Sequence, residues 1–333
     1  MDLDGRDRRR ESMNRRQLLT GSAAASLALA LDPIAFAARV GGSGVAFVTA
    51  DLESHVVLVE LASGRTVGRI RTAPGPRSIE SVHGRTALVA HTDHGGITLI
   101  DAVSRRIRAE LDGFEAPRYT AAHPTRALAY VTDSASQKIV VVDVDRAKVS
   151  WRTPVPGPAR HVSLSPDGST LWTALGTTAE RVAVLDISDP RRPKLVRTFA
   201  APFLAHDIVF APDGRAVWVT SGSERRIALY RPGSKKPKRV IVAGASPQHV
   251  AFAGDKAFVA SGDDGTLRRH RLDGELVREA RVPLGSYNVT FAYGQIVTPS
   301  LGQGTVSLLD RNGRVRTVRQ VARAAHDACI LVT

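Results

Sequence analysis

The sequence predicts an all-β, seven-bladed β-propeller built from four-stranded antiparallel blades. A unit consisting of a turn and short apolar strands recurs with a period near 41 residues, which is the blade length of a propeller. Val, Thr and Gly are spread through short apolar runs, and long amphipathic helical patterns do not occur in the sequence. The two ends of the repeated region supply complementary parts of one blade, which predicts a closed ring.

The composition fits a folded, well-cored protein. Hydrophobic residues make up 43% of the 333 residues and charged residues 23%, so wholesale disorder is excluded. Lys and Arg number 46 against 32 Asp and Glu, which gives a net charge of +14 with histidine neutral. The single cysteine, Cys329, excludes an internal disulfide framework and a multi-cysteine metal site. Because Cys329 lies in an apolar run, we expect an inert core residue.

Residues 1–37 are predicted to be a twin-arginine signal peptide. Arg15 and Arg16 precede an apolar run at residues 23–31, and a small-residue cleavage site follows at residues 35–37. This run is far shorter than the roughly 20 residues that span a membrane, so no integral span is expected after cleavage. We therefore expect export by the twin-arginine route to a periplasmic, cell-wall-associated or secreted location.

Each repeat begins with a turn that leads into a first apolar strand. The clearest copies are residues 157–168, 205–214 and 246–255. Each copy continues into a second apolar strand and a third that commonly ends in Asp, and Pro-Asp-Gly and Asn-Gly signals mark hairpin turns between strands. Residues 38–43 are expected to be a short linker and residues 44–333 a single propeller domain.

The chain ends predict how the ring closes. Residues 328–332 read as the first strand of a blade, and the chain stops directly after them. Residues 45–49 and 56–60 read as the second and third strands of a blade. The last blade is therefore expected to combine strands from both ends, which leaves no free sheet edge.

These repeats resemble the exported β-propeller repeats of the YVTN and YncE-like families, within the wider lactonase-like and nitrite-reductase-like propeller group. Residues 165–174 and 211–220 carry the resemblance best, and residues 129–133 (AYVTD) come nearest to the tetrapeptide that names the family. The resemblance covers nearly all of residues 42–333. It implies a propeller fold, and because the families include ligand-binding, cell-surface and enzymatic members, it leaves the chemistry open.

The residues that introduce the first strands are expected to form a ring at one mouth of the central channel. Four of the seven ring residues are histidines although the chain holds only ten, against about 0.2 expected by chance. This enrichment is the sharpest functional signal in the sequence. One residue per blade gives the ring Ser78, Tyr119, His161, His206, His249, Asn288 and His326.

Imidazoles that converge on one axis suit a divalent transition metal such as Zn, Cu or Fe, although no cofactor is certain from the sequence. The candidate metal ligands are His161, His206, His249 and His326. The first three are also candidate catalytic acids or bases. The alternative is that ring histidines bond to backbone carbonyls, pack the channel and were copied when the repeats multiplied.

Further candidate ligand-binding residues lie beside the ring. Arg77, Arg118 and Arg160 precede it in three neighbouring blades and suit a carboxylate or phosphate, with a solvated surface as the alternative. Two acids could orient a histidine ring or add charge: Asp207 and Asp327. The remaining candidates are Tyr119, Gln248, Tyr287 and Asn288.

Other motifs carry weaker signals. His91, Asp93 and His94 have the types of metal ligands but are expected to form a solvated turn. The basic stretches at residues 191–194 and 235–239 lack interleaved aromatics, so solvated turns or wall-polymer contacts are expected rather than nucleic-acid binding. The sequence contains no nucleophile elbow, P-loop or dinucleotide fingerprint.

We therefore expect an exported, monomeric binding propeller whose His- and Arg-lined channel mouth receives a small anionic ligand, a metal or a cell-envelope component, and no nucleic acid. The first alternative is an enzyme, a lyase or lactonase-like hydrolase, that uses the channel histidines with or without a metal. The second alternative is a protein-interaction scaffold. The sequence does not identify the ligand.

Overall fold

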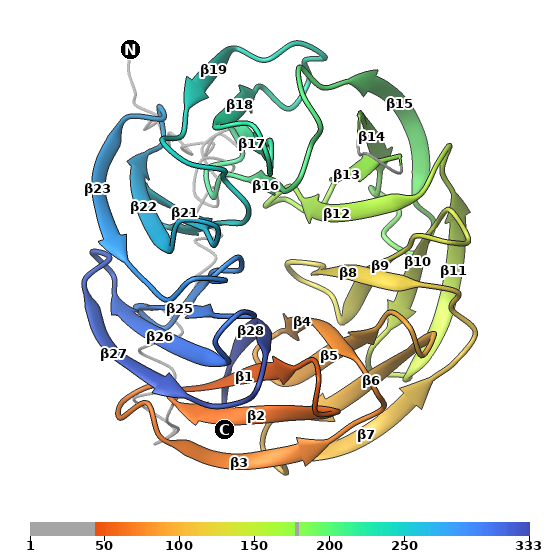
Figure 1. Cartoon of the computed structure of the whole chain (residues 1–333). Helices are drawn as coiled ribbons and strands as arrows, with labels where there is room; N and C mark the ends of the chain where they lie inside the picture. The colour runs from red at the N-terminus through yellow and green to blue at the C-terminus, as the bar shows by residue number, and fades with distance from the viewer. Residues whose placement is uncertain (1–43, 177–179) are drawn as a thin grey trace, which may run out of the picture.

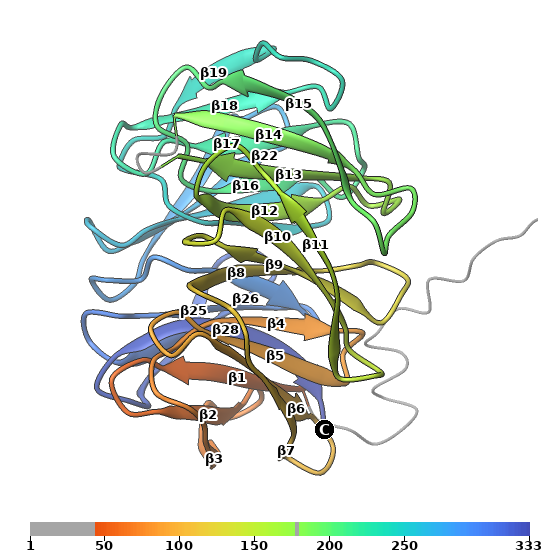
Figure 2. The ribbon, with the colours of Figure 1, turned by 90° about the vertical axis from the view of Figure 1, so that its right-hand side faces the viewer.

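A computed structural model describes residues 44–176 and 180–333, so the predicted signal peptide and linker lie outside the described residues. The described residues form seven four-stranded antiparallel sheets and no helix. The sheets are arranged in a ring around a central axis, and the edge-on view shows them as blades of a disc (Figures 1 and 2). The protein is therefore a seven-bladed β-propeller, as predicted. No helix in the described part of the chain could cross a membrane.

The first three blades follow one another along the chain, each written from its innermost to its outermost strand. Blade 1 contains β4 (Pro76–Val82), β5 (Thr86–His91), β6 (Gly96–Asp101) and β7 (Arg106–Leu111). Blade 2 contains β8 (Pro117–Ala122), β9 (Leu128–Asp133), β10 (Lys138–Asp143) and β11 (Lys148–Pro154). Blade 3 contains β12 (Ala159–Leu164), β13 (Thr170–Leu175), β14 (Arg181–Asp186) and β15 (Lys194–Ala200).

The remaining four blades complete the ring. Blade 4 contains β16 (Ile208–Phe210), β17 (Val217–Thr220), β18 (Arg226–Tyr230) and β19 (Arg239–Val242). Blade 5 contains β20 (Val250–Ala253), β21 (Lys256–Ser261), β22 (Thr266–Arg271) and β23 (Leu276–Arg281). Blade 6 contains β24 (Thr290–Ala292), β25 (Gln295–Pro299), β26 (Thr305–Asp310) and β27 (Val315–Gln320). Blade 7 contains β28 (Ala325–Val332), β1 (Gly44–Ala50), β2 (His55–Glu60) and β3 (Thr66–Arg71).

Blade 7 confirms the predicted closure. Its innermost strand, β28, comes from the C-terminal end of the chain and pairs with β1 near the N-terminal end. The antiparallel register places Val45 opposite Leu331 and Phe47 opposite Cys329. Because this pairing occupies the inner edge of β1, no sheet edge is left open where the ring closes.

Apolar side chains between neighbouring blades form the core. Trp172 on blade 3 is fully buried and packs against Phe210 and Tyr230 of blade 4, with ring centroids 6.0 and 5.8 Å apart. The second and third strands of most blades are buried along most of their length, whereas the fourth strands are largely exposed. The innermost strands of most neighbouring blades contact one another, and together they surround the axis (Figure 1).

The predicted hairpin turns have the backbone that their sequences require. Gly168 and Gly214, the glycines of two Pro-Asp-Gly turns, have φ angles of 70° and 67°, a region that suits glycine. Asp167 accepts a hydrogen bond from the backbone N–H of Ser169 at 3.0 Å, as turn aspartates do.

Candidate functional site

Two consecutive residues at the start of each innermost strand lie at the channel, and strand pairing shows which ones correspond. The reference residues, paired with equivalent positions of the second strands, are Ile79, Thr120, Val162, Ile208, Val250, Thr290 and Ala328. The residues immediately before them form the inner row: Ser78, Tyr119, His161, Asp207, His249, Val289 and Asp327. The residues one further back form the mouth row: Arg77, Arg118, Arg160, His206, Gln248, Asn288 and His326.

This register corrects the equivalence expected from the sequence in three blades. His206, Asn288 and His326 lie one position before the row that contains His161 and His249, and their places in that row are taken by Asp207, Val289 and Asp327. The expected equivalence matched histidine with histidine, whereas the Pro-Asp-Gly turns give the register of the structure, because Asp207 lies six residues before Asp213 as His161 lies six residues before Asp167. The ladders of β16, β20 and β24 begin later.

Three of the four predicted metal ligands lie together. His161, His206 and His249 come from blades 3, 4 and 5, and each offers a ring nitrogen within 4.8 Å of the others. The centroid of the His161 ring lies 4.6 Å from that of His206 and 4.7 Å from that of His249. The fold therefore brings imidazoles from three consecutive blades to one point at the channel.

His161 is the central member of this histidine cluster. Its side chain is only 2% exposed, and neither Nδ1 nor Nε2 has a hydrogen-bond partner. Tyr119 covers one side of the ring, with centroids 3.5 Å apart and the planes tilted by 33°. A buried polar atom without a partner costs about 1–3 kcal/mol, so His161 holds the least satisfied polar atoms of the cluster.

Burial keeps the cluster neutral. Burial, together with the nearby positive charges of Arg160 and Arg118, lowers the pKa of His206 to about 4. Burial also lowers the pKa values of His161 and His249 well below the usual range, and the neighbouring imidazoles add to this shift. Neutral imidazole, which has a free lone pair, is the form that binds a metal ion.

Asp207 connects the cluster to the frame of the ring. Its carboxylate accepts hydrogen bonds from the backbone N–H groups of Ile208 and Val250, at 2.9 Å each, and so links blades 4 and 5. Its Oδ2 lies 3.6 Å from Nδ1 of His249. Burial raises the pKa of Asp207 to about 7. Asp207 thus lies beside the His249 ring, whereas the sequence suggests only that it could orient a histidine ring or add charge.

Asp327 makes the equivalent link on the other side of the ring. It accepts hydrogen bonds from the backbone N–H groups of Ile79 and Ala328, at 3.1 and 2.8 Å. It therefore ties the closing strand β28 to β4 of blade 1. Burial raises its pKa as well.

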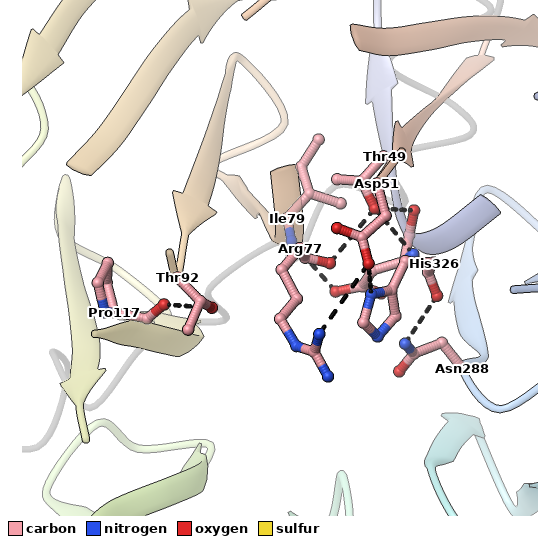
Figure 3. A network of polar contacts seen from close by, with 9 residues as sticks. Thr49, Asp51, Arg77, Ile79, Thr92, Pro117, Asn288 and His326 are labelled. Carbon is pink, nitrogen blue, oxygen red and sulfur yellow. Dashed lines mark hydrogen bonds and ion pairs between the residues drawn. The ribbon is translucent and has the colours of Figure 1, made fainter. Parts of the chain in front are cut away.

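His326 does not join the histidine cluster in the described structure. Its Nδ1 lies 3.0 Å from Oδ2 of Asp51, which also lies 4.0 Å from Arg77, and its backbone carbonyl accepts a hydrogen bond from Asn288 (Figure 3). Asp51 is in the hairpin after β1, 275 residues away in sequence. The sequence analysis missed Asp51, and only its position just after a second strand could have suggested it.

The mouth row places three arginines on blades 1, 2 and 3. Arg118 is half-buried, and its Nε has no hydrogen-bond partner. Burial lowers the pKa of Arg118, and the positive charges of Arg160 and Arg77 lower it further. The positive charges of the three arginines therefore repel one another. A bound anion would relieve this repulsion.

Gln248 and Tyr287 bond to hairpins at the channel mouth, the one between β17 and β18 and the one between β21 and β22. Gln248 donates a hydrogen bond to the carbonyl of Gly222 at 3.2 Å and accepts one from the N–H of Gly262 at 3.0 Å. Tyr287 donates its hydroxyl proton to Asp263 at 3.1 Å. These contacts give both candidates a structural role in fixing loops at the channel.

A cavity of about 870 Å³ extends from the inner row into the channel, and all seven inner-row residues line it. Glu80, two residues after Ser78 on β4, also lines it and was not among the predicted candidates. Burial raises the pKa of Glu80 to about 8, and the negative charge of Asp327 contributes. The period-two alternation of a strand, which places Ser78 and Glu80 on one face, was the available signal. Cys329 also lines this cavity, and it is buried, as its apolar run predicted.

The raised pKa of Glu80 gives a pH dependence of stability. The folded protein keeps the Glu80 proton up to about pH 8, whereas the unfolded chain loses it near pH 4.3, so stability falls as pH rises between these values. The slope is at most about 1.4 kcal/mol per pH unit. We expect Glu80→Gln to flatten the decline between about pH 5 and pH 8 in chemical denaturation experiments. The exposed Glu110→Gln variant is the control, and an unchanged slope in Glu80→Gln would contradict the assignment.

His91 does not lie in a solvated turn, which corrects the expectation for residues 91–94. It is fully buried at the end of β5, its Nδ1 is 3.1 Å from the carbonyl of Pro74, and its Nε2 is 2.8 Å from the hydroxyl of Thr98. Both ring nitrogens are thus used in packing the blade, and His91 has a structural role.

Comparison with known proteins identifies the fold class. No family model and no curated protein matches the sequence significantly. A protein of unknown function from Desulfotomaculum acetoxidans superposes with a TM-score of 0.74 at 14% identity, covering 86% of this chain and 98% of the other. Hydrazine synthase from Kuenenia stuttgartiensis gives 0.70 at 15% identity, covering 79% and 91%. Apo AztD from Citrobacter koseri gives 0.69 at 12% identity, covering 87% and 98%.

At these identities the likeness concerns the fold alone. It supports the assignment of the chain to the β-propellers, a class whose members differ in function. The resemblance to the YVTN and YncE-like families stays a prediction, because no family model matches.

Proposed function

We propose that this protein is a binding propeller that holds a divalent transition-metal ion at His161, His206 and His249. The observation that carries the proposal is the fully buried His161 ring, whose two nitrogens have no partner and which lies against two further imidazoles. Three neutral imidazoles with an open fourth position are a common zinc ligand set.

The distances describe a cluster that must contract slightly around an ion. A tetrahedral zinc ion with Zn–N bonds of about 2.1 Å requires ligand nitrogens about 3.4 Å apart. The cluster nitrogens lie within 4.8 Å of one another, so binding would bring them together by up to about 1.4 Å. Asp207, beside His249, would keep that ring oriented, in the way that carboxylates support metal-bound histidines.

The arginines of the mouth row favour a small anion as the companion of the metal. Arg118 and Arg160 lie near enough to His161 and His206 to lower their pKa values, so they also oppose a bare cation there. A carboxylate or phosphate that bridges the metal and the arginines would remove this repulsion. The proposed ligand is therefore a metal ion together with a small anion.

Metal content tests the proposal directly. Protein purified without a histidine tag is expected to contain, or to take up in calorimetric titration with Zn²⁺, one ion per chain. Adding phosphate or acetate should tighten Zn²⁺ binding in the wild type and should not do so in Arg118→Gln. Absence of Zn²⁺ and Cu²⁺ uptake by the folded protein would refute the proposal. An enzyme of the lyase or lactonase class would instead show turnover that is lost when His161 is replaced.

We also propose that the protein is exported by the twin-arginine route, on the basis of residues that lie outside the described ones. Replacing Arg15 and Arg16 by lysine is expected to retain most of the protein in the cytoplasm, because the paired arginines define this signal. Cell fractionation measures the effect, with Arg9→Lys and Arg10→Lys as the matched control. Undiminished export of the first variant would contradict the proposal.

A further inference from the structure

The net positive charge of the propeller is concentrated on its rim. The outermost strands of the seven blades, β3, β7, β11, β15, β19, β23 and β27, are here called the outer belt. Their sequences contain 13 Lys or Arg and two acids, Glu110 and Glu279. Residues 44–333 contain 39 Lys or Arg and 27 Asp or Glu, a net charge of +12. The belt alone therefore accounts for +11 of this charge.

Most belt cations form no ion pair with a carboxylate within 4 Å among the described residues. All of them except the half-buried Arg197 are exposed. Several guanidinium groups donate to backbone carbonyls of a neighbouring blade, as Arg69 does to Val321 at 2.7 Å and Arg152 to Gly113 at 3.1 Å. A carbonyl satisfies the hydrogen bond but does not neutralise the charge, as a carboxylate would. Arg281, 3.9 Å from Glu279, is an exception.

Aspartates at the ends of four third strands take part in the turns that lead to the belt. Asp101, Asp143, Asp186 and Asp310 end third strands and accept hydrogen bonds from backbone N–H groups of the following turns, at 2.7 to 3.0 Å. Turns favour aspartate for this reason. Three of these aspartates pair in register with cations at the starts of outer strands: Asp101 with Arg106, Asp143 with Lys148 and Asp186 with Lys194. They reduce the positive charge at that end of the belt and leave the rest of its excess in place.

The circular shape of the belt favours a flexible polymer chain over a flat membrane surface as its partner. The outer strands follow one another around the whole circumference of the disc (Figure 1). A flat anionic membrane would touch the strands of only one or two blades at a time. A flexible chain can follow the rim and contact cations on several blades together, which multiplies the electrostatic attraction.

We propose that the outer belt binds an extended, flexible polyanion with phosphate or carboxylate groups along its backbone. The propeller would thereby be held on an anionic polymer by its rim while its channel mouth remains open to the metal and anion of the proposed function. The belt does not require that function, because none of its residues belongs to the inner or mouth rows.

Long-chain sodium polyphosphate is the probe for the test, and its affinity is measured by calorimetry at several NaCl concentrations. The salt slope is the decrease in the logarithm of the affinity per unit increase in the logarithm of the NaCl concentration. If about four belt cations bind the polymer together and each contributes about 0.7 to this slope, affinity falls about 50-fold between 50 and 200 mM NaCl. Anionic phospholipid vesicles provide the flat surface for comparison. Binding to vesicles as tight as to polyphosphate would overturn the choice of a flexible chain.

A charge-matched pair of variants separates the belt from net charge. The belt variant replaces one cation on each outer strand by glutamine: Arg69, Arg106, Lys148, Lys194, Arg239, Arg278 and Arg316. The control replaces seven exposed cations outside the belt: Arg85, Arg126, Arg215, Arg231, Lys235, Lys236 and Arg323. We expect the belt variant to lose at least tenfold in affinity at 50 mM NaCl and about half the salt slope, and the control to stay within threefold of the wild type.

Equal losses in the two variants, or no binding of the wild type at 50 mM NaCl, would refute the belt as a site. If the sevenfold belt variant does not fold, a smaller one remains: Arg106, Lys148, Lys194 and Arg278 to glutamine. These four side chains make no hydrogen bond to another blade among the described residues, and their loss should still reduce affinity severalfold. Polyphosphate binding should survive His161→Leu, so failure of the metal proposal and failure of this one are distinguishable.

Discussion

Replacing His161 by leucine is expected to reduce the affinity of the channel for Zn²⁺ more than about 100-fold. Loss of a residue that only supports a metal ligand costs about 10- to 100-fold, and His161 is the central ligand of the cluster. Leucine fills most of the volume beside Tyr119, so the blade should keep its packing. Calorimetric titration of metal-free protein measures the change.

The same variant should be more stable than the wild type without metal. The two unpartnered ring nitrogens of His161 disappear, and each costs about 1–3 kcal/mol when buried, although relaxation reduces the net gain. A rise in melting temperature together with a loss of metal affinity separates a binding role from a packing role. A structural histidine would give a less stable variant and unchanged metal binding.

Two histidines serve as matched controls for the metal titration. His94 lies in the hairpin between β5 and β6 and is not part of the cluster, and the Nδ1 of His326 is bonded to Asp51. Leucine at either position is expected to leave Zn²⁺ affinity within threefold of the wild type. A loss in His326→Leu as large as in His161→Leu would restore the four-histidine site predicted from the sequence and refute the three-histidine cluster.

Deleting residues 325–333 is expected to abolish cooperative folding. These residues contain β28, which pairs with β1 and contributes Ala328 and Ile330 to the core between blades 6 and 7. It also contributes Cys329 and Leu331 to the core between blades 7 and 1. Without β28 both cores are opened, and the edge of β1 is available for aggregation.

A circular permutant provides the control for this deletion. Val332 pairs directly with Gly44, so residues 325–333 can be placed before residue 44 through a short Asn-Gly turn, with the new chain ending at residue 324. We expect the permutant to melt cooperatively within a few degrees of the wild type, as measured by circular dichroism. A cooperative, monomeric deletion variant with an unchanged melting temperature would contradict the closing role of β28.

The repeats predicted the fold well because blade construction is local. Each turn and strand of the Pro-Asp-Gly units depends on residues within the same 41-residue period, so the count of blades and the closure by both ends were evident from the sequence. His161, His206 and His249 were recognised for the same reason, since each stands beside the first strand of its own repeat.

It was harder to predict which residues occupy equivalent positions in different blades. Matching one histidine with another put the sequence alignment one residue out for His206 and His326, because strand pairing places Asp207 and Asp327, and not these histidines, level with His161. Asp51 became the partner of His326 across 275 residues. The exposure of His91 was also misjudged, because its burial depends on Pro74 and Thr98.

The sequence by itself determined a seven-bladed ring, the pairing of its two ends and the presence of histidine and arginine at the channel. Only the tertiary structure decided which of these side chains meet, which ring nitrogens are left without partners, and that Glu80 and Asp207 keep protons at unusual pH. The physical reason is that a strand's path follows from its own residues. Contact, burial and pKa depend on groups that other blades bring to the axis.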